Sequence, residues 1–186
     1  MRTLSITAAT LITLLTTGCV NTPDDSGTTA AAGSVVSANP QTLFAARLQP
    51  ASGLETSVMA GNQLRISFPG MTAFSHDGAR LSSALQQQLT HIVESLKGIN
   101  YQRLAVLGHT DSSGQLAYNN KLSQQRAEQV KAFMLQQGLA AETIAAEGRG
   151  PAEPIADNNT AEGKAANRRV ELVISFEQPL TAAVTD

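Results

Sequence analysis

Residues 101–138 constrain the fold of this chain more than any other stretch, because they combine an apolar strand, a polar loop and a helix in one unit. The apolar run at residues 104–107 stops at Gly108, a pattern that predicts a short buried strand. Loops at strand ends hold their side chains in place and stay open to solvent. We therefore expect the functional residues at this junction.

The helix of this unit is expected to begin at Ser123, whose hydroxyl can cap the first free amides. Leu122 and Ala127 are placed to form a hydrophobic staple around that start. Gly138 is expected to end the helix. Its predicted buried face consists of Ala127, Val130, Phe133 and Met134.

A helix start at Ser123 places Arg126 in the first turn, where unpaired amides and the helix dipole disfavour a cation. Asp111 is the nearest anion to compensate it, because strand end and helix start are adjacent in such a unit. Two interpretations stay open at this point. The pair is a structural salt bridge, or Asp111 binds a ligand ammonium while Arg126 holds a ligand carboxylate.

Several short motifs of this region resemble the signature of one family, the OmpA-like C-terminal domain, which is the peptidoglycan-binding module of Gram-negative envelopes. The resemblance covers about residues 60–176. The motifs are Gly108-His109-Thr110-Asp111, Asn119, Leu122-Ser123, Arg126-Ala127 and Asn167-Arg168-Arg169-Val170.

The resemblance implies non-catalytic binding of peptidoglycan through the meso-diaminopimelate of its stem peptide. It favours the receptor interpretation of Asp111 and Arg126, and it implies that Thr110, Asn119, Leu122 and Arg168 complete the site. It also implies an α/β (α+β) fold of the βαβαββ sandwich type. This fold has a small mixed sheet with two main helices packed on one face.

The N-terminus reads as a secretory signal peptide over residues 1–18, with Arg2 before an apolar run too short to span a membrane. Cys19 follows Thr16-Thr17-Gly18 in a segment that resembles a bacterial lipobox, although Leu15 stands one position earlier than the usual leucine. The resemblance implies lipidation of Cys19, and Val20 after it implies sorting to the outer membrane, with the domain facing the periplasm. An ordinary signal peptide with an incidental thiol is the alternative.

The remaining sequence predicts one domain at residues 46–178, between a flexible tether at 19–45 and a disordered tail at 179–186. Its expected elements are a short helix at 41–48, a hairpin of strands 54–59 and 63–68, a helix over 81–96, a strand at 144–147, a polar loop at 154–167 and a strand at 170–176. Gly148 and Gly150 are expected in a turn.

The loop at residues 74–77 could line the same site as Asp111, but its Phe74-Ser75 departs from the Phe-Asp that family members often carry. This loop is therefore not part of the predicted site.

Composition and motif spacing argue against several other functions. A net charge of −2 with scattered basic residues makes nucleic acid a poor ligand. His109, Asp111 and Ser112 lie too close on one loop to form a catalytic triad, and His109 is expected instead to anchor its loop by hydrogen bonds. The histidines lack metal-site spacing, so we expect no bound metal. We also expect no catalysis and no cofactor. The remaining alternative is an envelope lipoprotein that acts mainly as a protein-interaction or regulatory module with its own partner.

Overall fold

The computed structural model describes residues 39–48, 54–74 and 80–177. The predicted signal peptide, Cys19, most of the tether and the tail at residues 179–186 lie outside these ranges. Among the described helices, none combines the length and the apolar character that a membrane span requires.

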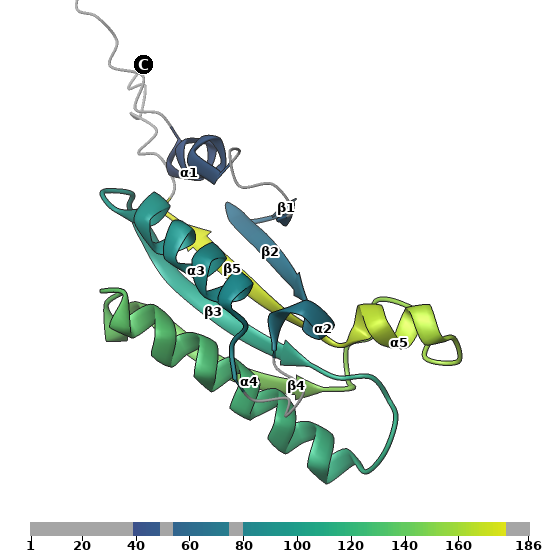
Figure 1. Ribbon diagram of the computed structural model, residues 1–186. Coiled ribbons are helices and arrows are strands. Elements are labelled where there is room, and N and C mark those ends of the chain that lie inside the picture. Colours follow the sequence, from purple (N-terminus) through teal and green to yellow (C-terminus); the bar gives the residue numbers. More distant parts are fainter. Residues whose placement is uncertain (1–38, 49–53, 75–79, 178–186) are drawn as a thin grey trace, which may run out of the picture. The chain divides into compact units, whose positions relative to one another are not determined.

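The described part of the chain contains a mixed five-stranded sheet in the order β1-β2-β5-β3-β4 (Figure 1). Its strands are β1 (Glu55–Met59), β2 (Gln63–Pro69), β3 (Tyr101–His109), β4 (Ile144–Gly150) and β5 (Arg169–Phe176). β3 and β4 run parallel, whereas β5 is antiparallel to both β2 and β3. The predicted mixed sheet is thereby confirmed.

Helices α3 (Ser83–Leu96) and α4 (Leu116–Gln136) cover one face of this sheet (Figure 1). The prediction of two main helices on one face is therefore confirmed. Shorter helices are α1 (Pro40–Leu48), α2 (Gly70–Ala73), the 3-10 turn η1 (Ala141–Thr143) and α5 (Ala161–Asn167).

Helix α1 belongs to the packed domain. Its Phe44 is fully buried, and the ring centroid lies 5.5 Å from that of Phe176 on β5. The short helix expected at residues 41–48 is therefore present and contributes to the hydrophobic core.

The hydrophobic core lies between the sheet and the two main helices. Alternate strand residues face it, as the period-two pattern of the last strand predicted. Each of the three central strands contributes two buried residues to this face: Leu64 and Ile66 from β2, Leu172 and Ile174 from β5, and Leu104 and Val106 from β3. The helices contribute Leu85, Leu89, Ile92, Leu96, Ala127, Val130 and Met134. The last three belong to the buried face predicted for the second main helix, whose fourth member, Phe133, is only half-buried.

The turns follow the predicted glycines. Gly61 and Asn62 adopt positive φ values of 73° and 58° between β1 and β2, as expected for a tight hairpin. Gly138, at φ 97°, ends α4, and its amide donates to the carbonyl of Leu135 while Leu139 donates to Met134. This pair of bonds is the Schellman arrangement that a C-terminal glycine favours.

The predicted start of the second main helix is wrong. Helix α4 begins at Leu116, and its N-cap Gln115 makes no side-chain capping bond. Ser123 lies fully buried inside the helix, where its hydroxyl accepts from the amide of Gly150 and donates to the carbonyl of Asn120. Arg126 therefore lies well past the first turn, and the helix-dipole argument does not apply to it.

Two loop predictions are also wrong. Residues 154–167 contain α5, whose N-cap Thr160 accepts from the amide of Gly163 at 3.0 Å. Gly148 belongs to β4 rather than to a turn. A Cβ on Gly148 would meet the backbone of Gln124, and one on Gly108 would meet the carbonyl oxygen of Ser123. Both glycines thus allow α4 to lie directly against the sheet.

Candidate functional site

The candidate site lies where β3 ends and the chain turns toward α4. The amide of Thr110 donates to the carbonyl of Gly150 at 2.9 Å, which ties the loop to the neighbouring strand end. Thr110 and Asp111 are 5% and 8% exposed, so the sheet edge holds both nearly buried. Asp111 lies just past the end of β3, as expected, but it is nearly buried rather than open to solvent.

Each oxygen of the Asp111 carboxylate accepts one charge-assisted or backbone hydrogen bond. Oδ2 lies 2.6 Å from Nη1 of Arg168, and Oδ1 accepts from the amide of Ser113 at 2.8 Å. A carboxylate can accept about four hydrogen bonds, more than these two contacts use. Arg168 is thus an ion-pair partner of Asp111 that the sequence argument did not choose.

Asn119 holds the shape of the loop. It is buried on the first turn of α4, and its Nδ2 donates to the carbonyls of Ser113 at 2.8 Å and Asp111 at 3.3 Å. In the structure, Asn119 therefore supports the loop backbone.

Arg126 lies on the same face of α4 as Asn119 and half-buried Leu122, since residues three and four apart are neighbours on a helix. Its guanidinium carbon is 5.1 Å from the centroid of the Phe74 ring, a cation–π distance. Burial lowers the pKa of Arg126, while the charges of Tyr118 and Asp111 act to raise it and that of Arg168 to lower it. Asp111, Arg126 and Arg168 therefore share one electrostatic site.

Phe74 is a site residue outside the predicted list. It is buried and forms an isolated bridge to Leu81, which fixes the ring beside Arg126. The sequence contained one indication of this role. Phe74 matches the phenylalanine that family members often carry at the start of the loop at 74–77, and only Ser75 departs from their Phe-Asp pattern.

The pKa of Asp111 lies below its ordinary value of 3.8. Burial acts to raise this pKa, but the hydrogen bonds from Arg168 and Ser113 outweigh it. Because the folded pKa is the lower one, the ionised carboxylate stabilises the native state above the ordinary pKa. That stabilisation is lost as the pH falls through the lowered value.

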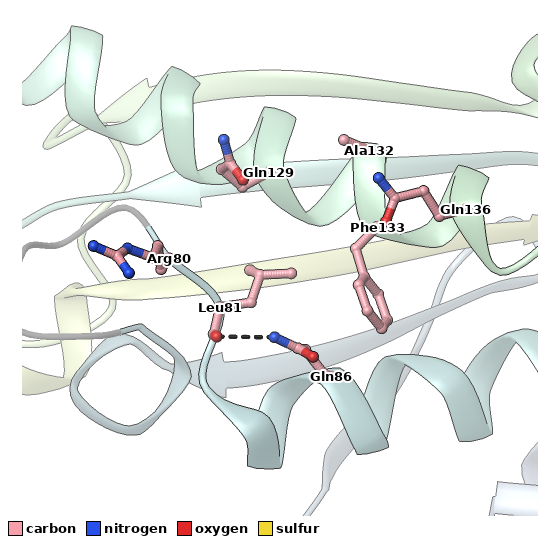
Figure 2. Close-up of a pocket in the computed structure, with 7 residues that line it drawn as sticks. All are labelled: Arg80, Leu81, Gln86, Gln129, Ala132, Phe133 and Gln136. Atoms are coloured by element: carbon pink, nitrogen blue, oxygen red, sulfur yellow. Dashed lines mark hydrogen bonds between the residues drawn. The ribbon is translucent and has the colours of Figure 1, made fainter.

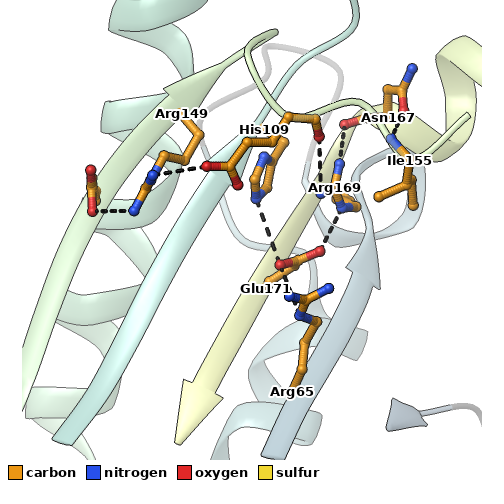
Figure 3. Close-up of polar contacts among 9 residues, drawn as sticks. Arg65, His109, Arg149, Ile155, Asn167, Arg169 and Glu171 are labelled. Carbon is orange, nitrogen blue, oxygen red and sulfur yellow. Dashed lines mark hydrogen bonds and ion pairs between the residues drawn. The ribbon is translucent and has the colours of Figure 1, made fainter. Parts of the chain in front are cut away.

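A second polar cluster, made of Arg65, His109, Arg169 and Glu171, lies on the sheet face opposite the main helices (Figure 3). Glu171 binds Arg169 at 2.7 Å and Arg65 at 3.3 Å. His109 Nε2 is 3.8 Å from Glu171, and burial, reinforced by the charge of Arg169, lowers the pKa of His109 to about 4.

The predicted anchoring role of His109 is wrong, because within the described residues neither ring nitrogen makes a hydrogen bond. Strand parity places His109 on the sheet face opposite the core residues Leu104 and Val106, and so in this cluster. Asn167 is structural as well, because its Oδ1 accepts from the amides of Ile155 and Ala156. In the described part of the chain, no group of three His, Cys, Asp or Glu residues could hold a metal ion.

Replacing Arg168 by glutamine should raise the pKa of Asp111. The variant Arg168→Gln removes the hydrogen bond that holds this pKa low and leaves the burial that raises it. A pH titration of the Asp111 side-chain carboxyl carbon by NMR measures the shift. Arg149→Gln is the matched control, since Arg149 pairs with Glu147 and Glu153 instead. An unchanged Asp111 titration in Arg168→Gln would contradict the geometry.

Comparison with known proteins places this site in a family. The model of the OmpA family matches residues 73–168. The chain is 34% identical over 125 residues to the outer-membrane lipoprotein YfiB of Pseudomonas aeruginosa, covering 67% of this chain and 66% of that protein. It is 41% identical over 106 residues to the peptidoglycan-binding protein ArfA of Mycobacterium tuberculosis, covering 57% and 32% of the two chains.

A solved structure, the cell wall anchor of the type VI secretion system (T6SS) of Pseudomonas aeruginosa, matches with a TM-score of 0.60 and 32% identity. The match covers 72% of this chain and 95% of that one. The chain spans about half the length of other curated relatives that it matches. The family match extends over the strand end, α4 and Arg168, and we conclude that this chain belongs to the OmpA family.

Proposed function

We propose that this chain binds peptidoglycan without chemical turnover, through the meso-diaminopimelate of the stem peptide, and so tethers the outer membrane to the cell wall. One observation carries the proposal. A nearly buried carboxylate, Asp111, shares a strand-end site with the guanidinium groups of Arg126 and Arg168. A relative named as peptidoglycan-binding and a structure named as a cell wall anchor support it.

The chemistry of diaminopimelate matches this arrangement. The free end of its side chain carries an ammonium and a carboxylate on one carbon. Asp111 accepts hydrogen bonds from the ammonium, and Arg126 holds the carboxylate through its planar fork. Arg168 keeps Asp111 ionised, and Phe74 holds the Arg126 guanidinium in place.

Removing either charge should abolish wall binding and leave the fold intact. Asp111→Ala and Arg126→Ala each delete one half of the receptor. The loss of stability should be only about 1 kcal/mol, because Arg168, the partner left behind by Asp111→Ala, has a side chain that is 32% exposed to solvent. Cosedimentation with insoluble sacculi and thermal unfolding should be measured on the same samples. Glu147→Ala and Arg149→Ala are charge-matched controls, because these residues pair with each other away from the site.

Two outcomes would contradict this prediction: both site variants bind sacculi normally, or both unfold. In either case Asp111 and Arg126 have a structural role, and the receptor lies elsewhere.

The proposed receptor should discriminate between stem peptides. Lysine at the same stem position keeps the ammonium but lacks the carboxylate, and a cross-link acylates the ammonium. Loss of one charge-assisted partner should weaken binding about ten- to a hundredfold. Calorimetric titration with soluble diaminopimelate, lysine and cross-linked muropeptides measures this preference. Equal affinities for the three ligands would exclude the dipolar mechanism even if sacculi are bound.

The anchor is the second part of the proposal. Lipidation of Cys19 would hold the chain at the outer membrane with the domain in the periplasm, and a relative named as an outer-membrane lipoprotein supports it. Two or more acyl chains give stable anchoring where one does not. We expect a lipid mass increment on Cys19 and release of a Cys19→Ser variant from the membrane fraction. Unmodified, freely soluble wild-type protein would remove the anchor.

One feature favours the alternative of a protein-interaction module. Exposed Met71 and Ile155 border a hollow of about 300 Å³ on the domain surface, and Val58 on the edge strand β1 is 75% exposed. Exposed apolar side chains of this kind are typical of partner surfaces. The sacculus experiment separates the two functions, because a chain that acts only on a protein partner stays in the supernatant at low salt.

A further inference from the structure

A groove runs between α3 and α4 on the same side of the sheet as Arg126 (Figure 2). Its volume is about 250 Å³. The lining residues are Arg80, Leu81, Gln86, Gln129, Ala132, Phe133 and Gln136. None of them belongs to the site described above, although the groove begins beside it.

The groove is continuous with the candidate site through two elements. Phe74, which lies under the Arg126 guanidinium, forms a bridge to Leu81 in the groove wall. On α4, Arg126 is followed at intervals of three, four and three residues by Gln129, Phe133 and Gln136, and such intervals form one stripe of a helix. A ligand held at Arg126 and lying along α4 would therefore enter the groove.

The lining suits a neutral ligand that carries many hydroxyl and amide groups. Glutamine amides donate and accept hydrogen bonds, and Gln129 and Gln136 are exposed at the rim. Gln86 donates through Nε2 to the carbonyl of Leu81 at 3.1 Å, which leaves its oxygen as an acceptor. The ring of Phe133 points from α4 into the groove and offers an apolar face for the C–H groups of a sugar ring (Figure 2).

The distances agree with the covalent structure of the wall. Arg126 and Phe133 are seven residues apart on α4, which corresponds to about 10 Å along the helix axis. In a stem peptide, the diaminopimelate side chain, γ-linked D-glutamate and L-alanine together separate the free side-chain end from the lactyl group of the amino sugar. This span is roughly 15 Å when extended, which more than covers the distance along the helix. A diaminopimelate bound at Asp111 and Arg126 can thus place its own sugar next to Phe133.

A second hollow extends the groove in the same direction. It shares Gln86 and Phe133 with the first and continues past Thr90 and His91 to Gln137. Its volume is about 620 Å³, which leaves room for a further sugar of the same strand.

We propose that the groove between α3 and α4 binds the N-acetylated amino sugar that carries the stem peptide, so that this domain reads glycan and peptide together. The inference rests on the proposed binding of the stem peptide at Asp111 and Arg126. It adds a second, neutral subsite that prefers a stem peptide still attached to its glycan.

The test compares two soluble ligands on the full mature chain, with Cys19→Ser in every sample to prevent lipidation. One ligand is the free tripeptide L-alanyl-γ-D-glutamyl-meso-diaminopimelate, and the other is the same tripeptide on its disaccharide. The disaccharide form should bind about tenfold more tightly, the equivalent of one or two net hydrogen bonds. The double variant Gln129→Ala/Gln136→Ala should lose this gain and keep the affinity for the free tripeptide. Gln125→Ala, an exposed glutamine of the same helix outside both hollows, should behave as wild type.

Four results would overturn the sugar subsite. Equal affinity of the wild type for both ligands, or a double variant that retains the gain, excludes the groove while tripeptide binding keeps the proposed function. A double variant that changes the association state of the chain instead identifies the groove as a protein interface. If neither ligand binds the wild type, the peptide receptor and the sugar subsite fail together.

Discussion

The insertion of β5 between β2 and β3 is the constraint on which both the core and the site depend. This strand pairs antiparallel with both neighbours, so its inward residues Leu172 and Ile174 lie at the centre of the core. The residue before the strand, Arg168, is thereby brought to the end of β3 and to Asp111, 57 positions away in the sequence. The same pairing that closes the sheet therefore assembles the charged site.

Close packing of α4 against the sheet provides the other half of the site. Gly108 and Gly148 leave no side chain between strand and helix, and the Ser123 hydroxyl bonds to the Gly150 amide across this contact. This close packing sets the position of Arg126 relative to Asp111. The groove described above runs along the same helix.

Periodicity in the sequence was sufficient to predict most of the fold. The strand pattern at β5, the helical repeat of α3 and the turn residues Gly61-Asn62 each depend on local burial or backbone geometry. The start of α4 and the presence of α5 were missed. Ser123 satisfies its hydroxyl through a strand distant in sequence, and α5 carries an alanine- and glycine-rich sequence with little apolar periodicity.

Family motifs located Asp111, Arg126 and Arg168 in the sequence. The pairing of Asp111 with Arg168 and the contact of Phe74 with Arg126 depend on strand order, which local patterns do not encode.

The most direct test of this account is an NMR map of backbone amide shifts during titration with a diaminopimelate muropeptide. We expect the largest changes at residues 110–113, at Arg126 and at Arg168, with smaller ones along α4 toward Gln136. The opposite sheet face, with Arg65 and Glu171, should stay unperturbed. Shifts concentrated on that face or on β1, with none at the end of β3, would contradict the assignment of the peptidoglycan site.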